Sequence, residues 1–261
     1  MDLGIAGKVA MVAASSKGIG LACAKALASE GCRVALCGRT EEALSRAVEE
    51  VRETGAEAMG FVCDVNRRDE LEAWYEAVRG AWGAPDIVVT NTGGPLPKPI
   101  QELTDEEWLA GFETTVLVAT RMTELAVGPM KERGWGRIVH LTSIVAFELS
   151  DLLAVSTTLR SGMRGLTRLQ ARAFGPHGIT VNSVLPGHTM TDRQIELAKK
   201  RAETEGIREE DHFAGLSQAI PVGRLGRPEE VAAAVTFLCG EPASYINGVS
   251  LLVDGGLARA I

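Results

Sequence analysis

The sequence predicts an α/β fold in which helices cover both faces of a parallel, doubly wound sheet of seven strands. Two observations predict it. Short apolar runs alternate with longer amphipathic stretches almost from end to end of the 261 residues. The runs are continuously apolar, as in strands buried on both faces, and strands alternating with helices form parallel sheets through right-handed crossovers. No charged block, Ser-rich linker or repeat interrupts the alternation, so we expect residues 1–261 to form a single domain.

The elements follow in order from this alternation. Strands are expected at residues 8–14, 33–38, 58–65, 86–91, 136–142, 179–187 and 249–256. Helices are expected between them at 20–30, 41–54, 68–82 and 228–239, with two longer helices at 105–130 and 152–174. Residues 190–220 depart from this alternation, because they are polar and helical in composition. They carry charges of both signs at Lys199, Lys200, Arg201, Glu203 and Glu205. An insertion after the sixth strand lies over the carboxyl ends of the strands, where such sheets bind ligands, so we expect a helical substrate lid.

Composition excludes several classes of partner. The formal net charge of −7 argues against nucleic acid, whose binding needs clustered Lys and Arg. No apolar run is long enough to cross a membrane, and no basic stretch precedes an apolar core at the N-terminus, so we expect no signal peptide and a cytoplasmic protein. The five cysteines are scattered through apolar segments without metal-ligand spacing. We expect them to be buried thiols in a reducing compartment, and we expect no metal site.

The first predicted strand runs directly into a glycine turn and a helix. The turn reads Ala14-Ser15-Ser16-Lys17-Gly18-Ile19-Gly20. Glycines let backbone amides approach a pyrophosphate, and the amino end of a helix favours negative charge. Because the turn stands between a strand and a helix, it predicts a Rossmann-type dinucleotide site at Ala14, Ser16, Lys17, Gly18, Ile19 and Gly20.

The end of the second strand indicates which dinucleotide binds. An acidic residue there binds the ribose 2′-hydroxyl of NAD, whereas an arginine accommodates the 2′-phosphate of NADP. This chain has Cys37-Gly38-Arg39-Thr40, with no carboxylate, and Lys17 lies in the phosphate loop. Two cations and no repelling anion favour NADP and make NAD the weaker candidate.

Further motifs carry a family resemblance over essentially the whole chain. They are the glycine turn, Cys63-Asp64-Val65, Thr90-Asn91-Thr92-Gly93, Leu141-Thr142-Ser143, Pro186-Gly187 and Val253-Asp254-Gly255-Gly256. In this order they resemble the short-chain dehydrogenase/reductase family, and are most similar to its 3-oxoacyl-carrier-protein reductases. The resemblance implies that Asp64 and Val65 flank the adenine and that Asn91 and Gly93 lie beside the ribose. It also implies that Pro186, Gly187, Thr189 and Thr191 hold the nicotinamide end. The family's first loop glycine is Ala14 here, and a residue with a Cβ requires a less extreme backbone.

The catalytic positions depart from that family. Members use a Ser, a Tyr and a Lys, with an Asn on the preceding long helix. The spacing places Ser143 at the serine, Ser156 at the tyrosine, Arg160 at the lysine and Thr115 at the asparagine. Serine is a far weaker acid than tyrosine, and arginine stays charged, so neither Ser156 nor Arg160 is a credible proton donor. His188 and His212 are replacement acid candidates, because histidine titrates near neutrality.

Three functions remain open at this point. The first is NADPH-dependent reduction of a carbonyl, either a 3-oxoacyl compound or a small ketone. The second is conjugate reduction of an enone-type C=C bond, where an oxyanion hole of Ser143, Thr115 and Arg160 stabilises an enolate without a tyrosine. The third is a cofactor-binding protein without redox turnover.

The two long helices also bear on assembly. They carry apolar residues beyond what one sheet contact requires, namely Val116, Leu117 and Ala119 on the first, and Leu159, Met163 and Leu166 on the second. Relatives pair these helices into dimers and tetramers, so the resemblance implies a homotetramer.

Overall fold

The computed structural model describes residues 1–95, 97–206 and 208–259, without the side chains of 197 and 200–205, and contains a seven-stranded sheet. The strands are β1 (Val9–Val12), β2 (Arg33–Gly38), β3 (Ala58–Val62), β4 (Ile87–Thr90), β5 (Gly136–Leu141), β6 (Ile179–Pro186) and β7 (Ser250–Val253). Their order is β3-β2-β1-β4-β5-β6-β7, and every neighbouring pair is parallel. The predicted fold class is confirmed. The order reverses between β1 and β4, and ligands bind outside the carboxyl ends of the strands at such a switch point.

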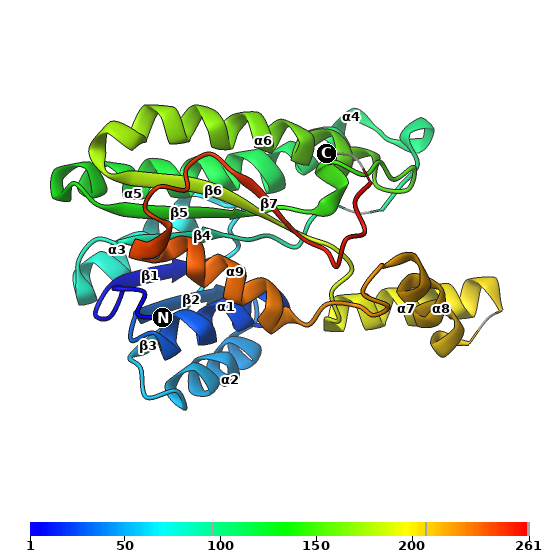
Figure 1. The fold of residues 1–261 in the computed structure, drawn as a ribbon, viewed down its shortest axis with the longest axis horizontal. Helices are drawn as coiled ribbons and strands as arrows, with labels where there is room; N and C mark the ends of the chain where they lie inside the picture. The colour runs from blue at the N-terminus through cyan, green and yellow to red at the C-terminus, as the bar shows by residue number, and fades with distance from the viewer. Residues whose placement is uncertain (96, 207, 260–261) are drawn as a thin grey trace.

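Helices cover both faces of the sheet, as Figure 1 shows. One layer is α1 (Gly18–Ser29), α2 (Glu41–Arg52) and α9 (Pro228–Cys239), and the other is α3 (Arg68–Trp82), α5 (Val118–Arg133) and α6 (Ala154–Phe174). The two cores reflect the alternation of side chains along each strand. In β1, for example, Ala10 and Val12 join the core under α1, whereas Val9 and Met11 join the core under α3 and α5.

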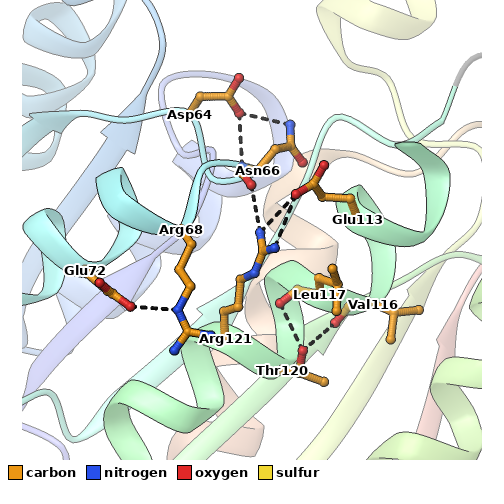
Figure 2. Close-up of polar contacts among 9 residues, drawn as sticks. All are labelled: Asp64, Asn66, Arg68, Glu72, Glu113, Val116, Leu117, Thr120 and Arg121. Carbon is orange, nitrogen blue, oxygen red and sulfur yellow. Dashed lines mark hydrogen bonds and ion pairs between the residues drawn. The ribbon is translucent and has the colours of Figure 1, made fainter. Parts of the chain in front are cut away.

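The long helix predicted at 105–130 is not one regular helix. It consists of α4 (Asp105–Phe112), the π-helix η2 (Glu113–Leu117) and α5. A π turn shifts carbonyl groups out of the regular i→i−4 ladder. The Thr120 hydroxyl compensates by donating to the carbonyls of Val116 at 3.2 Å and Leu117 at 3.0 Å, as Figure 2 shows. A periodicity of 3.6 residues in the sequence carries no signal for this insertion.

The apolar residues assigned to outer faces of the long helices are only partly outside. Ala119 and Met163 are buried and pack inward, so that part of the prediction is wrong. The large apolar side chains that do reach the surface here are Leu109 and Phe112 on α4 and Leu169 on α6. About half a turn of a helix separates an inward position from an outward one, and the sequence pattern did not resolve the two.

The segment expected as a lid forms two helices, α7 (Asp192–Glu205) and α8 (Glu209–Ala219). They follow β6, contact each other and stand to one side of the sheet (Figure 1). Position 207 of the predicted 190–220 lid, and the side chains of Lys200, Arg201, Glu203 and Glu205, lie outside the described residues. The amino end of α7 contacts the loop after β4.

The remaining elements are short 3₁₀ turns: η1 (Ile100–Glu102), η3 (Ile144–Ala146), η4 (Gly175–His177) and η5 (Glu241–Ala243). All five cysteines are buried free thiols, and burial raises the pKa of Cys23 and of Cys32 to about 12. Among the described residues, no helix combines the length and the apolar character needed to cross a bilayer.

Candidate active site

The glycine turn after β1 is held by hydrogen bonds to the end of β2 and to the loop after β4. The Ser15 hydroxyl donates to the Val12 carbonyl at 2.7 Å and accepts from the Cys37 amide at 3.2 Å. The Asn91 amide group donates to the Ala14 carbonyl at 3.1 Å. Ala14 adopts a φ of 44°, in the left-handed region that favours glycine. The expectation that its Cβ would require a less extreme backbone is therefore wrong: these bonds hold the turn in the glycine-like conformation despite a strain of about 1–2 kcal/mol.

Two glycines shape this turn and the start of the helix that follows it. Gly18 has a φ of 59°, and it begins α1. A Cβ on Gly20 would lie 2.5 Å from the Ala14 carbonyl oxygen and 2.7 Å from the Asn91 amide nitrogen, so no side chain fits there. The amino end of α1 thus presents backbone amides beside Ser16, Lys17 and Ile19, and such an end favours an anionic ligand.

The cations predicted to select the dinucleotide lie at the mouth of this turn. Gly38 packs so closely that its Cβ would meet the Ser16 side chain at 2.9 Å, which brings the end of β2 against the turn. Lys17 and Arg39 are both exposed, and neither forms an ion pair within the described part of the chain. Their positive charges are therefore available to a ligand phosphate.

The loop after β3 is tied to the π-helix, as Figure 2 shows. The Asp64 carboxylate accepts from the backbone and side-chain amides of Asn66 at 3.1 and 2.9 Å, and Val65 beside it is buried. The Arg121 guanidinium donates to the Asn66 carbonyl at 2.7 Å and to the Glu113 carboxylate at 3.2 Å. Arg121 therefore fixes the position of this loop relative to η2.

The loop after β6 faces the glycine turn. At Gly187 a Cβ would lie 2.8 Å from the Asp254 Cα, so β7 packs directly against the Pro186-Gly187 step. The Thr189 hydroxyl is buried and donates to the Gly187 carbonyl at 3.2 Å. The Thr191 methyl group lies 3.6 Å from the position that a Cβ on Gly18 would occupy. The loops after β1 and β6 thus meet at the switch point, and Gly93 lies exposed on the β4 loop nearby.

The four predicted catalytic residues come from three elements that contact one another, because α6 packs against both η2 and η3. Ser143 precedes η3, is partly exposed, and accepts from the Val145 amide at 3.4 Å. Thr115 lies in the middle of η2, and its buried hydroxyl has no partner among the described residues. Ser156 and Arg160 share one face of α6, as predicted, and the Arg160 Nε donates to the Ser156 Oγ at 3.1 Å.

Arg160 has a neighbour that the sequence did not predict. Its Nη2 lies 3.2 Å from the position of a Cβ on Gly94, and the Nη1 of Arg193 lies 3.5 Å from the same point. Burial, with the charge of Arg193, lowers the pKa of Arg160 to about 10, so the group remains protonated at neutral pH. The one available signal for Arg193 was its place two residues after Thr191, in the loop assigned to the cofactor.

The histidines and tyrosines are placed less favourably for acid catalysis. His140 is wholly buried between the Thr90 hydroxyl at 2.9 Å and the Gln170 side-chain oxygen at 2.8 Å, and burial lowers its pKa to about 4. Tyr75 is buried in the core under α3, and Tyr245 is fully exposed. His188 is partly exposed in the loop after β6, and His212 lies on α8.

A pocket of about 190 Å³ adjoins these residues. Gly94, Pro95 and Val155 form its wall toward Arg160 and Ser156, and α4 forms the opposite wall. Gly111 lets α4 approach closely, since its Cβ would overlap the Val155 side chain at 2.2 Å. Inside the pocket, Lys98 and Glu107 form an ion pair at 2.8 Å.

Comparison with known proteins gives three consistent findings. Residues 13–258 match the family model described as Enoyl-(Acyl carrier protein) reductase. The chain is 31% identical over 255 residues to the 3-oxoacyl-[acyl-carrier-protein] reductase of Pseudomonas aeruginosa, covering 98% of this chain and 99% of that protein. Among solved structures, L-sorbose reductase from Gluconobacter frateurii, complexed with NADPH and L-sorbose, is 32% identical over 100% of both chains, with a TM-score of 0.96. A variant of actinorhodin polyketide ketoreductase with NADPH is 35% identical over 97% of this chain and 98% of that one, with a TM-score of 0.92.

Proposed function

Because this chain belongs to the short-chain dehydrogenase/reductase family, we propose that it is an NADPH-dependent oxidoreductase that reduces the carbonyl group of a 3-oxoacyl-type compound or a small ketone. One observation carries the proposal: the glycine turn and the loop after β6 meet beside the element that carries Ser156 and Arg160. This arrangement would place a dinucleotide between a phosphate cradle and a cluster of hydrogen-bond donors.

The described residues fit NADPH. The glycine turn would present the amino end of α1 to a diphosphate, and Lys17 and Arg39 offer unpaired charge to a 2′-phosphate. We propose that Asp64 and Val65 flank the adenine, that Asn91 and Gly93 lie beside the ribose, and that Pro186, Gly187, Thr189 and Thr191 hold the nicotinamide end. When bound, NADPH supplies the hydride. The sorbose reductase and polyketide ketoreductase structures, both with NADPH, support this choice.

We propose that Ser143 and Arg160 bind the oxygen that becomes negatively charged when the carbonyl carbon receives a hydride. Both groups donate hydrogen bonds, and donors held in place before the reaction stabilise such an oxyanion without reorganising. Ser156 would orient Arg160 through their hydrogen bond, and Thr115 offers a further buried hydroxyl. Since Ser156 and Arg160 stand where the family has Tyr and Lys, the alkoxide would take its proton from water.

Conjugate reduction of a C=C bond is the second candidate. The matching family model carries the name of an enoyl reductase, and the proposed oxyanion donors suit an enolate as well as an alkoxide. An enolate needs no proton in the step that forms it, so the absence of a strong acid at Ser156 is no obstacle to this reaction.

A substrate screen separates these functions. Ketones, 3-oxoacyl thioesters and enones are each incubated with the protein and NADPH, and the loss of NADPH absorbance is followed with product analysis. Alcohol products confirm carbonyl reduction, and saturated ketones confirm conjugate reduction. Tight NADPH binding with no oxidation for any substrate would instead favour a cofactor-binding protein without turnover.

Two further features belong to this proposal. We propose one domain over the whole chain, located in the cytoplasm, where the five buried thiols would remain reduced. We also propose a homotetramer, because Leu109 and Phe112 on α4 and Leu169 on α6 expose apolar surface on the long helices.

A further inference from the structure

Arg160 is a buried cation without an acidic partner. Its side chain is about nine-tenths buried, at 8% exposure, and its one polar partner within the described residues is the Ser156 hydroxyl. A neutral hydroxyl does not balance a guanidinium charge, and a charge removed from water is costly unless it is paired. The structure therefore leaves one positive charge at the site uncompensated by the chain itself.

Arg193 adds a second cation at the same place. It belongs to the first turn of α7, yet its guanidinium reaches back to the β4 loop, where it approaches the Pro95 carbonyl at 3.5 Å. Its Nη1 and the Nη2 of Arg160 both lie within 4 Å of one point above Gly94. Burial and the charge of Arg193 lower the pKa of Arg160, as expected for two cations that face each other.

Acidic groups nearby do not neutralise the pair. Glu196, one turn along α7, acts on Arg193 through its charge but forms no ion pair with it in the described structure. Glu107 is the carboxylate of the adjoining pocket, and it is already paired with Lys98. The pair of arginines is thus complementary to an external anion, and a guanidinium binds a carboxylate through two parallel hydrogen bonds.

We propose that Arg160 and Arg193 together bind a carboxylate of the substrate, so that the preferred substrates are oxo acids rather than neutral ketones. This proposal rests on the proposed function, because it places the carbonyl of that acid beside Ser143. Arg160 keeps its role at the carbonyl oxygen, since a guanidinium has five N–H donors and can meet that oxygen and the neighbouring carboxylate together. Gly94 and Pro95 lie between the arginine pair and the pocket under α4, so the pocket would receive the rest of the acid. The absence of a side chain at Gly94 is what leaves both guanidinium groups open at this point.

The diphosphate of the cofactor is the other anion that the pair could meet. It has its own cradle at the amino end of α1, where Thr191 faces Gly18. Arg160 is instead bonded to Ser156, on the element that packs against Ser143 and Thr115. This placement favours a substrate anion, and the experiment below separates the two sources.

The test compares 2-oxo and 3-oxo acids of three to eight carbons with their methyl esters, which lack the negative charge and add one methyl group. We expect the wild-type protein to reduce the acids with a kcat/KM at least tenfold higher than that of the esters. Arg193→Gln should remove that preference by raising KM for the acids, while the rates with the esters stay unchanged. Arg168→Gln is the matched control, because Arg168 is an exposed arginine on α6 and its loss should leave the preference intact.

A binding measurement keeps the test independent of turnover. Calorimetric titration of the protein–NADP⁺ complex with each acid and ester should show acid binding that Arg193→Gln weakens at least tenfold. Acid binding without any reduction would refute the proposed function and leave the carboxylate site standing. Equal binding of acids and esters overturns the site. A tenfold loss of NADPH affinity in Arg193→Gln, with the acid preference unchanged, assigns the pair to the diphosphate and also overturns it.

Discussion

At the scale of single residues, the site is defined by charges that lack a partner within the chain. Lys17 and Arg39 are exposed and unpaired in the described structure, whereas Arg160 is buried and bonded to a hydroxyl alone. An unpaired cation at the surface costs little free energy, because water solvates it. A buried cation is costly unless an anion balances its charge. The two kinds of cation therefore support different parts of the proposed function, namely cofactor selection and charge stabilisation.

Arg39→Ala should reduce the preference for NADPH over NADH. Loss of one charge-assisted contact to the 2′-phosphate removes about 1.5–3 kcal/mol of binding free energy, or roughly tenfold to a hundredfold in affinity. NADH, which lacks that phosphate, should bind the variant and the wild type equally. Fluorescence titration at moderate salt measures both dissociation constants. Arg46→Ala, at an exposed position on α2, is the control. Equal affinities for NADPH and NADH in the wild type would contradict the assignment.

Ser143→Ala should lower kcat/KM steeply with any accepted substrate and leave NADPH affinity nearly unchanged. Removing one oxyanion donor typically costs about 2.7–4 kcal/mol of transition-state stabilisation, or roughly 10²–10³ in rate. Steady-state kinetics and a cofactor titration give the two readouts. Ser161→Ala is the control, since among the described residues that hydroxyl bonds only to the backbone carbonyls of Ala146 and Thr157.

The double variant Ser156→Tyr with Arg160→Lys complements this test. If only the acid is missing from the site, the tyrosine should improve reduction of neutral ketones, because its pKa comes closer to neutrality beside a cation. If Ser143→Ala leaves kcat/KM unchanged with every accepted substrate, the proposed oxyanion site is wrong.

At the scale of elements, two sets of hydrogen bonds hold the elements around the site together. Arg121 joins the loop after β3 to the π-helix that contains Thr115, as Figure 2 shows. His140 joins β4, β5 and α6 through Thr90 and Gln170. Because the Gln170 oxygen can only accept, the Nε2 of His140 carries the proton and its Nδ1 accepts from Thr90. Burial, which lowers the pKa of His140 to about 4, keeps the imidazole neutral at pH 7.

The His140 connection predicts a loss of stability in mild acid. The pKa of His140 is about 4 in the folded protein and about 6.5 when the chain is unfolded. Between these values the unfolded chain binds the extra proton, so the free energy of unfolding falls as the pH falls. From pH 7.5 to pH 5 the loss should be about 2 kcal/mol. Urea unfolding at fixed protein concentration measures it.

The control for this prediction is a histidine that faces solvent. His140→Gln should abolish most of the pH dependence between pH 7.5 and 5, although its stability at pH 7.5 should itself be lower. His177→Gln, at an exposed position in η4, should retain the wild-type slope. The Glu230 carboxylate does not interfere, because its pKa, about 2 beside Arg224 in the folded protein and about 4.5 when the chain is unfolded, lies below this window in both states. A slope unchanged in His140→Gln would refute the assignment.

At the scale of the whole molecule, exposed apolar residues on α4 and α6 support the proposed homotetramer. Leu109 on α4 and Leu169 on α6 expose more than 60% of their surface, at 69% and 65%. A single exposed leucine is ordinary on a protein surface. Two of them, on helices that would meet between subunits of the proposed tetramer, favour a subunit contact. Figure 1 shows that α4 and α6 lie on the same side of the sheet.

Light scattering at micromolar concentration should therefore give a mass near four times the 27.7 kDa chain. Leu109→Glu and Leu169→Glu, which place a charge in the expected contact, should shift the mass to dimers or monomers. Leu149→Glu is the control, because Leu149 is also exposed but lies outside the two helices. A wild-type mass near 27.7 kDa would refute the tetramer.

The sequence by itself determined the fold class, the position of every strand and the loops that form the candidate site. Each of these follows from local signals: an apolar run, a glycine turn or a residue at the end of a strand. The pairing of Ser156 with Arg160 was predictable for the same reason, because four residues along one helix always share a face.

Only the tertiary structure decided three features. They are the left-handed backbone of Ala14, the π-helix around Thr115 and the approach of Arg193 to Arg160. Ala14 is held by Asn91, which is 77 residues away in the sequence, and Arg193 approaches Gly94 from 99 residues away. Such contacts depend on how distant loops close over the same edge of the sheet. Local periodicity and residue preference contain no information on that closure, so the sequence located the loops of the candidate site without predicting that Arg193 meets Arg160 there.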